Sequence, residues 1–159
     1  MQTNRLLSKL YTIKDLRNGS IKEIPKKSGV YFILMPMDFH IHIKSETDGS
    51  KLTSKGDPSV YPIEKLLEKV EHYEMEEPLK SHLLYIGSSN NIKRRINQYI
   101  NHYPNHSGGR DIWQLENSEN LFISYIECST EKESKELEHR LLISYKNIYG
   151  TYPFANWRS

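Results

Sequence analysis

The sequence predicts an α/β (α+β) domain in which a small sheet is flanked by helices. Two kinds of apolar pattern lead to this prediction. Short continuous runs with the β-branched and aromatic content of buried strands lie at residues 29–35, 83–87 and 121–127. Longer segments that repeat apolar residues every three or four positions, as amphipathic helices do, lie at residues 62–77, 92–103 and 131–148.

The first half of the chain contains the least regular of these elements. A short helix is expected around residues 12–17, ahead of the first apolar strand. Residues 39–44 (FHIHIK) alternate strictly, which predicts a half-exposed strand. The helix at residues 62–77 begins at Pro62 and ends before Pro78. Its charges are mostly acidic, so this surface should turn away from a polyanion.

A basic residue interrupts the apolar face of the helix at residues 92–103. Arg95 falls three residues after Ile92 and four before Tyr99, inside the apolar stripe. A guanidinium does not lose its proton, and burying it without a partner is costly. An anion should therefore lie beside Arg95, and it is either a carboxylate of the fold or a bound phosphate.

The helix at residues 131–148 also has a charged residue beside its apolar positions, in this case a negative one. Glu138 lies at the edge of an apolar arc that includes Leu141 and Leu142. A carboxylate held there needs a cation. From periodicity alone, a structural Arg95–Glu138 ion pair explains the two charges as well as a functional site does.

The composition of the chain limits the classes of protein to which it can belong. The chain has 159 residues, 36% of them hydrophobic and 26% charged, which suits one globular domain over residues 1–159. Its formal net charge of +2 does not by itself identify a nucleic-acid binder. With Cys128 as the single cysteine, no internal disulfide or cysteine-based metal site can form. No apolar run is long enough to span a bilayer, so we expect a cytoplasmic protein without a membrane partner.

Five separated motifs together resemble one family. They are GVY at residues 29–31, YIG at 85–87, NNIKRR at 90–95, LEHRLL at 137–142 and PFAN at 153–156. A three-residue match alone carries little information, but these five occur in the right order and in the right predicted elements. In this pattern the chain is similar to the GIY-YIG nucleases.

The resemblance implies a small three-stranded central sheet and a hydrolase, namely a DNA endonuclease that uses one divalent metal ion. Glu138 would be the metal ligand, and Tyr31 the general base or the group that orients the attacking water. Tyr85 would position water or phosphate, Arg95 would hold the scissile phosphate, and Asn156 would brace the site. The products would carry 5′-phosphate and 3′-hydroxyl ends.

The residue types suit this chemistry. A fixed cation and a metal ion can stabilise the charge that develops on phosphate oxygens. A supply of oxygen ligands favours Mg²⁺ or Mn²⁺ over zinc. Lys93, Arg94 and Arg110 are further candidates for contacts with the DNA backbone, although solvated surface positions are the alternative for each.

The spacing of the two tyrosine motifs departs from the family pattern, because they normally lie close together and here a long segment separates them. We interpret residues 37–81 as an insertion between the two motif strands. With three residues after Asn156, we expect no separate DNA-binding domain. Specificity would then come from the insertion, the N-terminal segment or a homodimer. Two alternatives stay open: a non-catalytic domain of the same fold that binds nucleic acid or a protein partner, and a purely structural domain.

Overall fold

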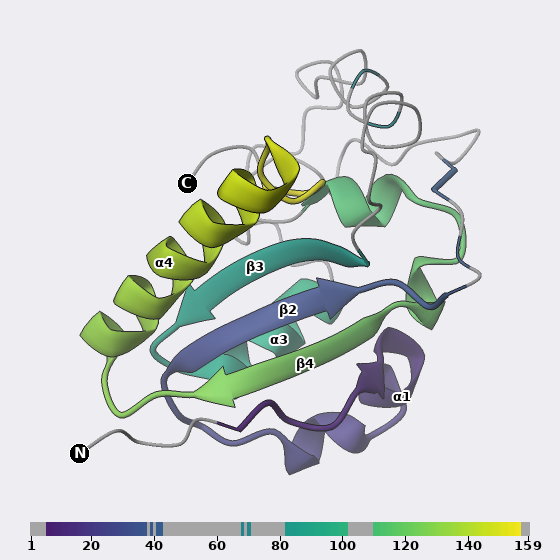
Figure 1. Ribbon diagram of the computed structural model, residues 1–159. Helices are drawn as coiled ribbons and strands as arrows, with labels where there is room; N and C mark the ends of the chain where they lie inside the picture. The colour runs from purple at the N-terminus through teal and green to yellow at the C-terminus, as the bar shows by residue number, and fades with distance from the viewer. Residues whose placement is uncertain are drawn as a thin grey trace, which may run out of the picture.

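The computed structural model describes residues 6–37, 39, 41–42, 68, 70, 82–101 and 110–156. In this part of the chain, four antiparallel strands form one sheet in the order β1-β4-β2-β3 (Figure 1). They are β1 (Tyr11–Thr12), β2 (Gly29–Leu34), β3 (Leu83–Ser89) and β4 (Phe122–Glu127). The helices are α1 (Ile13–Arg17), α3 (Ile92–Ile100) and α4 (Glu131–Tyr149), with 3-10 turns η1 (Ser20–Glu23), η4 (Arg110–Gln114) and η5 (Ser118–Asn120).

The predicted α+β class is confirmed, but the sheet has four strands rather than the three expected. The additional strand is β1, whose Tyr11 and Thr12 pair with Ile123 and Phe122 of β4. Two residues are too few to show an alternating pattern, since a period of two needs several repeats before it can be recognised. The extended conformation of β1 therefore depends on its pairing with β4 and could not be predicted from the local sequence.

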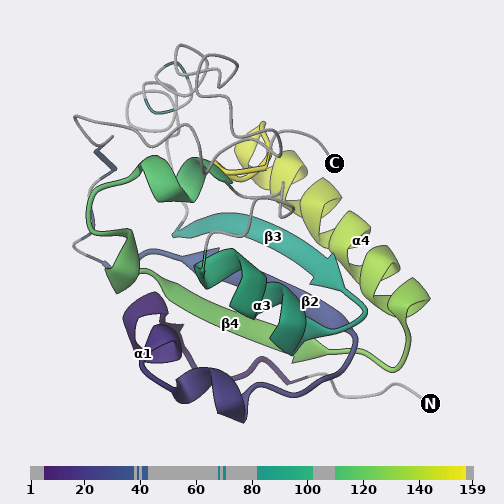
Figure 2. The ribbon, with the colours of Figure 1, turned by 180° about the vertical axis from the view of Figure 1, so that it is seen from behind.

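Helices lie on both faces of the sheet, as the two opposite views show (Figures 1 and 2). On one face, α1 and α3 cover a core that includes Tyr31 and Ile33 of β2 and Ile96 of α3. On the other face, α4 packs against Val30, Phe32 and Ile86 through Leu142. Successive residues of β2 thus enter opposite cores, as the alternation of side chains along a strand requires.

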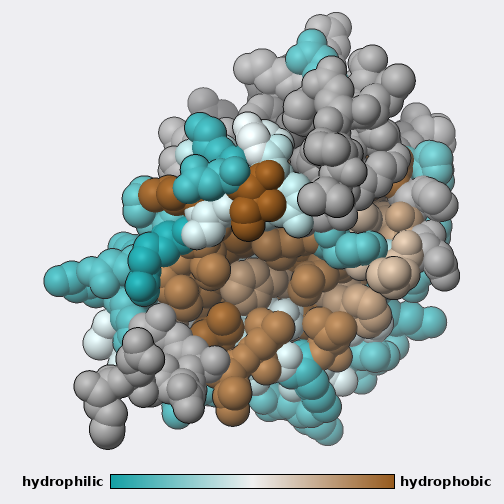
Figure 3. All heavy atoms as spheres, viewed as in Figure 1, coloured by the Kyte–Doolittle hydropathy of each residue, from teal (hydrophilic) through white to brown (hydrophobic). Residues whose placement is uncertain are grey.

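The face that carries α4 is only partly covered. The helix lies along β3 and β2, and apolar side chains remain visible over the rest of this face (Figure 3). Leu34 and Ile126 are half-buried there, and Leu7, which bridges to Ile126, is exposed. Among the described residues, this face is therefore the more open of the two.

Side-chain caps fix where the two long helices begin. The Asn91 side chain accepts a hydrogen bond from the Arg94 N–H at the start of α3, and Thr130 does the same for Glu133 at the start of α4. Gly150, in the left-handed region at φ 80°, ends α4. The loop before β2 is tied to α3 as well, because the Lys27 carbonyl accepts from the Ile92 N–H at 2.8 Å.

Several predicted elements lie largely outside the described residues. Of the strand predicted at residues 39–44, Phe39, Ile41 and His42 are described, and they belong to no strand. Of the helix predicted at residues 62–77, Glu68 and Val70 are described, and both are helical. Most of the proposed insertion at residues 37–81 is outside the described part. Among the residues that are described, no helix combines the length and the apolar character needed to cross a bilayer.

Candidate active site

The register of β2 and β3 brings the two tyrosine motifs together. Tyr31 lies opposite Gly87, and Ile33 lies opposite Tyr85, so both tyrosines project from the same face as diagonal neighbours. Their ring centroids are 5.9 Å apart in an edge-to-face arrangement. The long segment between the motifs in the sequence does not prevent this pairing.

The glycines of both motifs are required by close approaches. A β-carbon on Gly87 would lie 2.7 Å from Tyr31 Cζ and 2.8 Å from Tyr31 Oη, so the hydroxyl end of that ring rests on the bare backbone of β3. A β-carbon on Gly29 would lie 2.3 Å from the Ile126 carbonyl oxygen and from Ile92 Cδ1. Gly29 thus lets β2, β4 and α3 meet closely, and Gly87 makes room for a site residue.

Arg95 reaches this pair of tyrosines from α3. Its neighbours Ile92, Ile96 and Tyr99 are buried, while Arg95 itself is half-buried. Its guanidinium donates a hydrogen bond to the hydroxyl of Tyr31. Within the described part of the chain, no carboxylate forms an ion pair with Arg95. Of the two anions that the sequence allowed, the described residues do not supply the carboxylate.

Glu138 approaches the same place from the opposite face of the sheet. It is half-buried on α4, and its Oε2 accepts a hydrogen bond from the hydroxyl of Ser88 in β3. Its charge acts on the hydroxyls of both Tyr31 and Tyr85. Because β3 is the edge strand and Gly87 has no side chain, groups from the two faces can meet around this strand. The structure therefore brings Tyr31, Tyr85, Arg95 and Glu138 together, without a direct Arg95–Glu138 salt bridge.

Burial dominates the electrostatics of the two tyrosines. It raises the pKa of Tyr31 above the ordinary value of 10.0, although the Arg95 charge and the hydrogen bonds from Tyr85 and Arg95 act in the opposite direction. Burial also raises the pKa of Tyr85 well above that value, and Tyr31 and Glu138 add to the rise. The hydrogen bond runs from the Tyr85 hydroxyl to the Tyr31 oxygen. Both side chains are therefore phenols at neutral pH.

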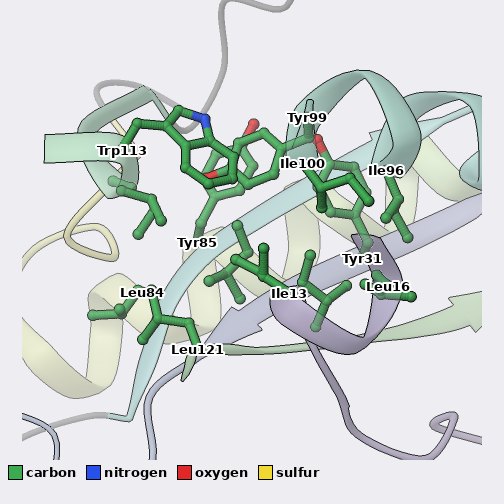
Figure 4. Close-up of a cluster of buried hydrophobic side chains, with 14 of the residues drawn as sticks. Ile13, Leu16, Tyr31, Leu84, Tyr85, Ile96, Tyr99, Ile100, Trp113 and Leu121 are labelled. Atoms are coloured by element: carbon green, nitrogen blue, oxygen red, sulfur yellow. The ribbon is translucent and has the colours of Figure 1, made fainter. Parts of the chain in front are cut away.

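An aromatic wall encloses the tyrosine pair on the α3 side (Figure 4). The ring of Tyr99 stacks parallel to Tyr85 at 6.3 Å, with an interplanar angle of 6°, and lies 6.5 Å from Tyr31. Trp113 of η4 packs against Tyr99 at 4.7 Å and is 4% exposed. This wall shields the tyrosines from water on that side, which accounts for the effect of burial on their pKa values.

Asn156 lies beside the site and contacts its scaffold. Its side-chain amide accepts a hydrogen bond from the Ile86 N–H and donates one to the Ile86 carbonyl, both at 3.0 Å. The Ala155 N–H also donates to the Leu84 carbonyl at 2.8 Å. These bonds close the outer edge of β3 on both sides of Tyr85. The predicted bracing role suits this position, and it acts through the strand.

The basic residues predicted to contact DNA differ in how they are placed. Arg94 is exposed and donates to the Asn90 side chain at 2.7 Å, while Lys93 is half-buried. A cavity of about 480 Å³ is lined by Arg94 together with Ser88 and Arg95. The side chain of Arg110, which begins η4, is outside the described part of the structure. DNA contact by these residues stays a prediction.

Sequence reasoning missed Ser88, which follows directly after the YIG motif. A serine has no periodic or charge signal, and its partner Glu138 lies 50 positions further along the chain. The only available signal was its place after Gly87, where the alternation of β3 turns its side chain toward α4. Its bond to Glu138 becomes visible only in three dimensions.

The site offers oxygen donors to a metal ion, with a single carboxylate among them. The Ser88 hydroxyl donates a hydrogen bond to Glu138, and the charge of Glu138 acts on the hydroxyls of Tyr31 and Tyr85. In the described residues, no group of three or more His, Cys, Asp or Glu side chains could hold a metal ion. Hard oxygen donors suit Mg²⁺ or Mn²⁺, which keep several water ligands and are commonly bound through one or two carboxylates plus substrate phosphates. The donor set therefore fits such an ion.

Comparison with known proteins identifies the family. The model of the GIY-YIG catalytic domain matches residues 71–152, just over half of the chain. The match includes Tyr85, Arg95 and Glu138, while Tyr31 and Asn156 lie outside it and join the site through the contacts described above. Neither a search of curated proteins nor one of solved structures found a match. The chain belongs to the GIY-YIG family, whose domain is generally a nuclease domain.

Proposed function

We propose that the protein is a metal-dependent DNA endonuclease that hydrolyses phosphodiester bonds to 5′-phosphate and 3′-hydroxyl ends. One observation carries the proposal: Tyr31, Tyr85, Arg95 and Glu138 interact with one another around β3, and Arg95 has a tyrosine hydroxyl beside it but no carboxylate partner among the described residues. A half-buried guanidinium without a carboxylate is suited to an anionic ligand. Family membership supports the same assignment at the level of a nuclease.

Arg95 binds the scissile phosphate in this proposal. Its N–H groups match the non-bridging oxygens of a phosphate, and its charge is fixed at any physiological pH. Because α3 is anchored by buried residues on both sides of Arg95, the guanidinium is held in place before the substrate arrives. Such preorganised charge stabilises the transition state without reorganisation.

Tyr31 orients the attacking water. The water oxygen forms the new bond to phosphorus as the bond to the 3′ oxygen breaks, and the 3′ oxygen takes up a proton from solvent. Its hydroxyl is held by hydrogen bonds from Arg95 and Tyr85. At neutral pH the hydroxyl is protonated, so Tyr31 can accept the proton of the water only after losing its own. Arg95 and Tyr85 favour that loss, because both donate to the Tyr31 oxygen.

Glu138 is the residue that would hold the metal ion, with Mg²⁺ or Mn²⁺ as the expected metal. When bound, the ion would supply positive charge that offsets the charge developing on the phosphate oxygens. The carboxylate of Glu138 is already oriented by Ser88. The site thus has one fixed cation, Arg95, and one anion, Glu138. Arg95 suits a phosphate, and Glu138 suits a divalent ion.

The experiment is incubation of the protein with supercoiled plasmid DNA and either Mg²⁺ or Mn²⁺. We expect nicking that EDTA stops and that Glu138→Gln abolishes. A Lys146→Ala variant is the matched surface control, because Lys146 lies in the last turn of α4, away from the site. The absence of nicking with either metal would refute the proposed reaction. Salt-dependent DNA retention in that case would favour a binding domain of the same fold.

A further inference from the structure

Ser88 connects the edge strand to the helix that carries the acidic residue of the site. It lies opposite Val30 in the register of β2 and β3, and Val30 faces α4. The side chain of Ser88 therefore projects toward α4 as well, where its hydroxyl donates to Glu138 Oε2. Both side chains are half-buried, so this bond is partly shielded from competing water.

This hydrogen bond restricts how the carboxylate of Glu138 can lie. A glutamate side chain has several rotatable bonds, and ordering it costs conformational entropy. A donor fixed in a β-strand orients one carboxylate oxygen before any ligand binds. A carboxylate has about four acceptor positions, so a single donor leaves it able to bind a cation.

We propose that Ser88 is a positioning residue that orients Glu138 for a divalent cation and so sets the affinity of the site for that ion. The inference rests on the proposed function, because Glu138 is taken as the residue that holds the metal. Outer partners that orient a metal ligand typically change metal affinity by about 10- to 100-fold when they are removed. Ser88 is the only described side chain that hydrogen-bonds Glu138.

A purely structural role for Ser88 makes a different prediction. If the hydroxyl only ties β3 to α4, its removal lowers the stability of the protein and leaves metal affinity unchanged. Stability and metal binding therefore have to be measured separately on the same variants. Metal binding is measured directly, without relying on DNA cleavage.

The experiment is titration of the full chain with Mn²⁺ alone, followed by the electron paramagnetic resonance signal of the free ion. Ser88→Ala should weaken Mn²⁺ binding by about 10-fold or more. Ser88→Thr keeps the hydroxyl and should bind like the wild type. Ser8→Ala is the matched control, since it removes a serine that accepts from the Tyr125 N–H in another part of the sheet. Thermal unfolding without metal is recorded for each variant.

The outcomes separate this inference from the proposed function. If Glu138→Gln abolishes Mn²⁺ binding but Ser88→Ala leaves it unchanged, the role of Ser88 is refuted and the metal role of Glu138 stands. Binding that survives Glu138→Gln overturns both. Weaker binding in Ser88→Ala, with wild-type affinity in Ser88→Thr and Ser8→Ala, supports the inference. A Ser88→Ala variant that loses stability but keeps its affinity identifies a structural tether and refutes it.

Discussion

The hydroxyl end of Tyr31 rests on the backbone of Gly87, so closely that a β-carbon there would lie 2.8 Å from Tyr31 Oη. Real β-carbons essentially never approach a heavy atom closer than 3.0 Å. The two residues come from the two tyrosine motifs and face each other across β2 and β3. Gly87 of the second motif therefore leaves the space that Tyr31 of the first motif occupies.

Gly87→Ala should displace the Tyr31 ring and abolish nicking. Overpacking a buried contact of this kind costs about 1–3 kcal/mol of stability. Chemical unfolding of Gly87→Ala, Tyr31→Ala and the double variant measures the coupling. We expect the Gly87→Ala penalty to shrink strongly when Tyr31 is already truncated. Additive penalties would show that the two residues do not interact in this way.

Asn156→Ala should loosen the outer edge of β3. It removes both hydrogen bonds to Ile86, at about 1 kcal/mol each, and leaves those backbone groups without their partner. Hydrogen exchange at the Ile86 amide should become faster while exchange in the centre of α4 changes little. Equal protection of Ile86 in the two proteins would contradict this role of the side chain.

Alkaline pH should destabilise the protein partly through Tyr85. Burial raises its folded pKa well above 10.0, so its contribution to stability is fully present below pH 10. As the pH rises past that value, the unfolded chain releases the proton first and the free energy of unfolding falls. Tyr85→Phe removes this titrating group. Its free energy of unfolding should fall with rising pH less steeply than that of the wild type, by up to about 1.4 kcal/mol per pH unit. Denaturant unfolding between pH 9 and pH 11.5 tests this, and an unchanged slope would contradict it.

Arg94→Ala should weaken DNA binding without altering its dependence on sequence. Arg94 is exposed at the cavity beside Arg95, where a phosphate of the DNA backbone can reach it. Loss of one phosphate contact reduces the slope of log K against log salt by about 1. Binding to a DNA duplex at several salt concentrations measures this slope. Lys146→Ala should keep the wild-type slope, and Arg94→Ala should not.

The sequence predicts the parts of the site that carry a charge or a motif. Arg95 is recognisable because a guanidinium interrupts an apolar stripe, and Glu138 because a carboxylate lies at the edge of an apolar arc on another helix. Tyr31 and Tyr85 are recognisable from their motifs. The register that sets Tyr31 on Gly87 is not predictable in this way, because it depends on pairing between strands that are far apart in the chain.

Other features depend on three-dimensional contacts that no local pattern encodes. Strand β1 exists only because β4 pairs with it, and Ser88 acquires a role only because α4 packs against β3. The protonation of Tyr31 is likewise not readable from the sequence. Arg95 lowers the pKa of Tyr31, but burial behind the aromatic wall of Tyr99 and Trp113 is the larger effect and raises it. Opposing effects of this kind can be weighed only when distances and exposure are known.

The bonds from Asn156 to Ile86 span 70 positions of the chain. During synthesis, β3 therefore keeps one side open until the segment that follows α4 has left the ribosome and docked. The outer edge of the strand that carries Tyr85 is thus completed only after that segment has docked. A nascent chain would accordingly lack a finished site until synthesis had passed Asn156.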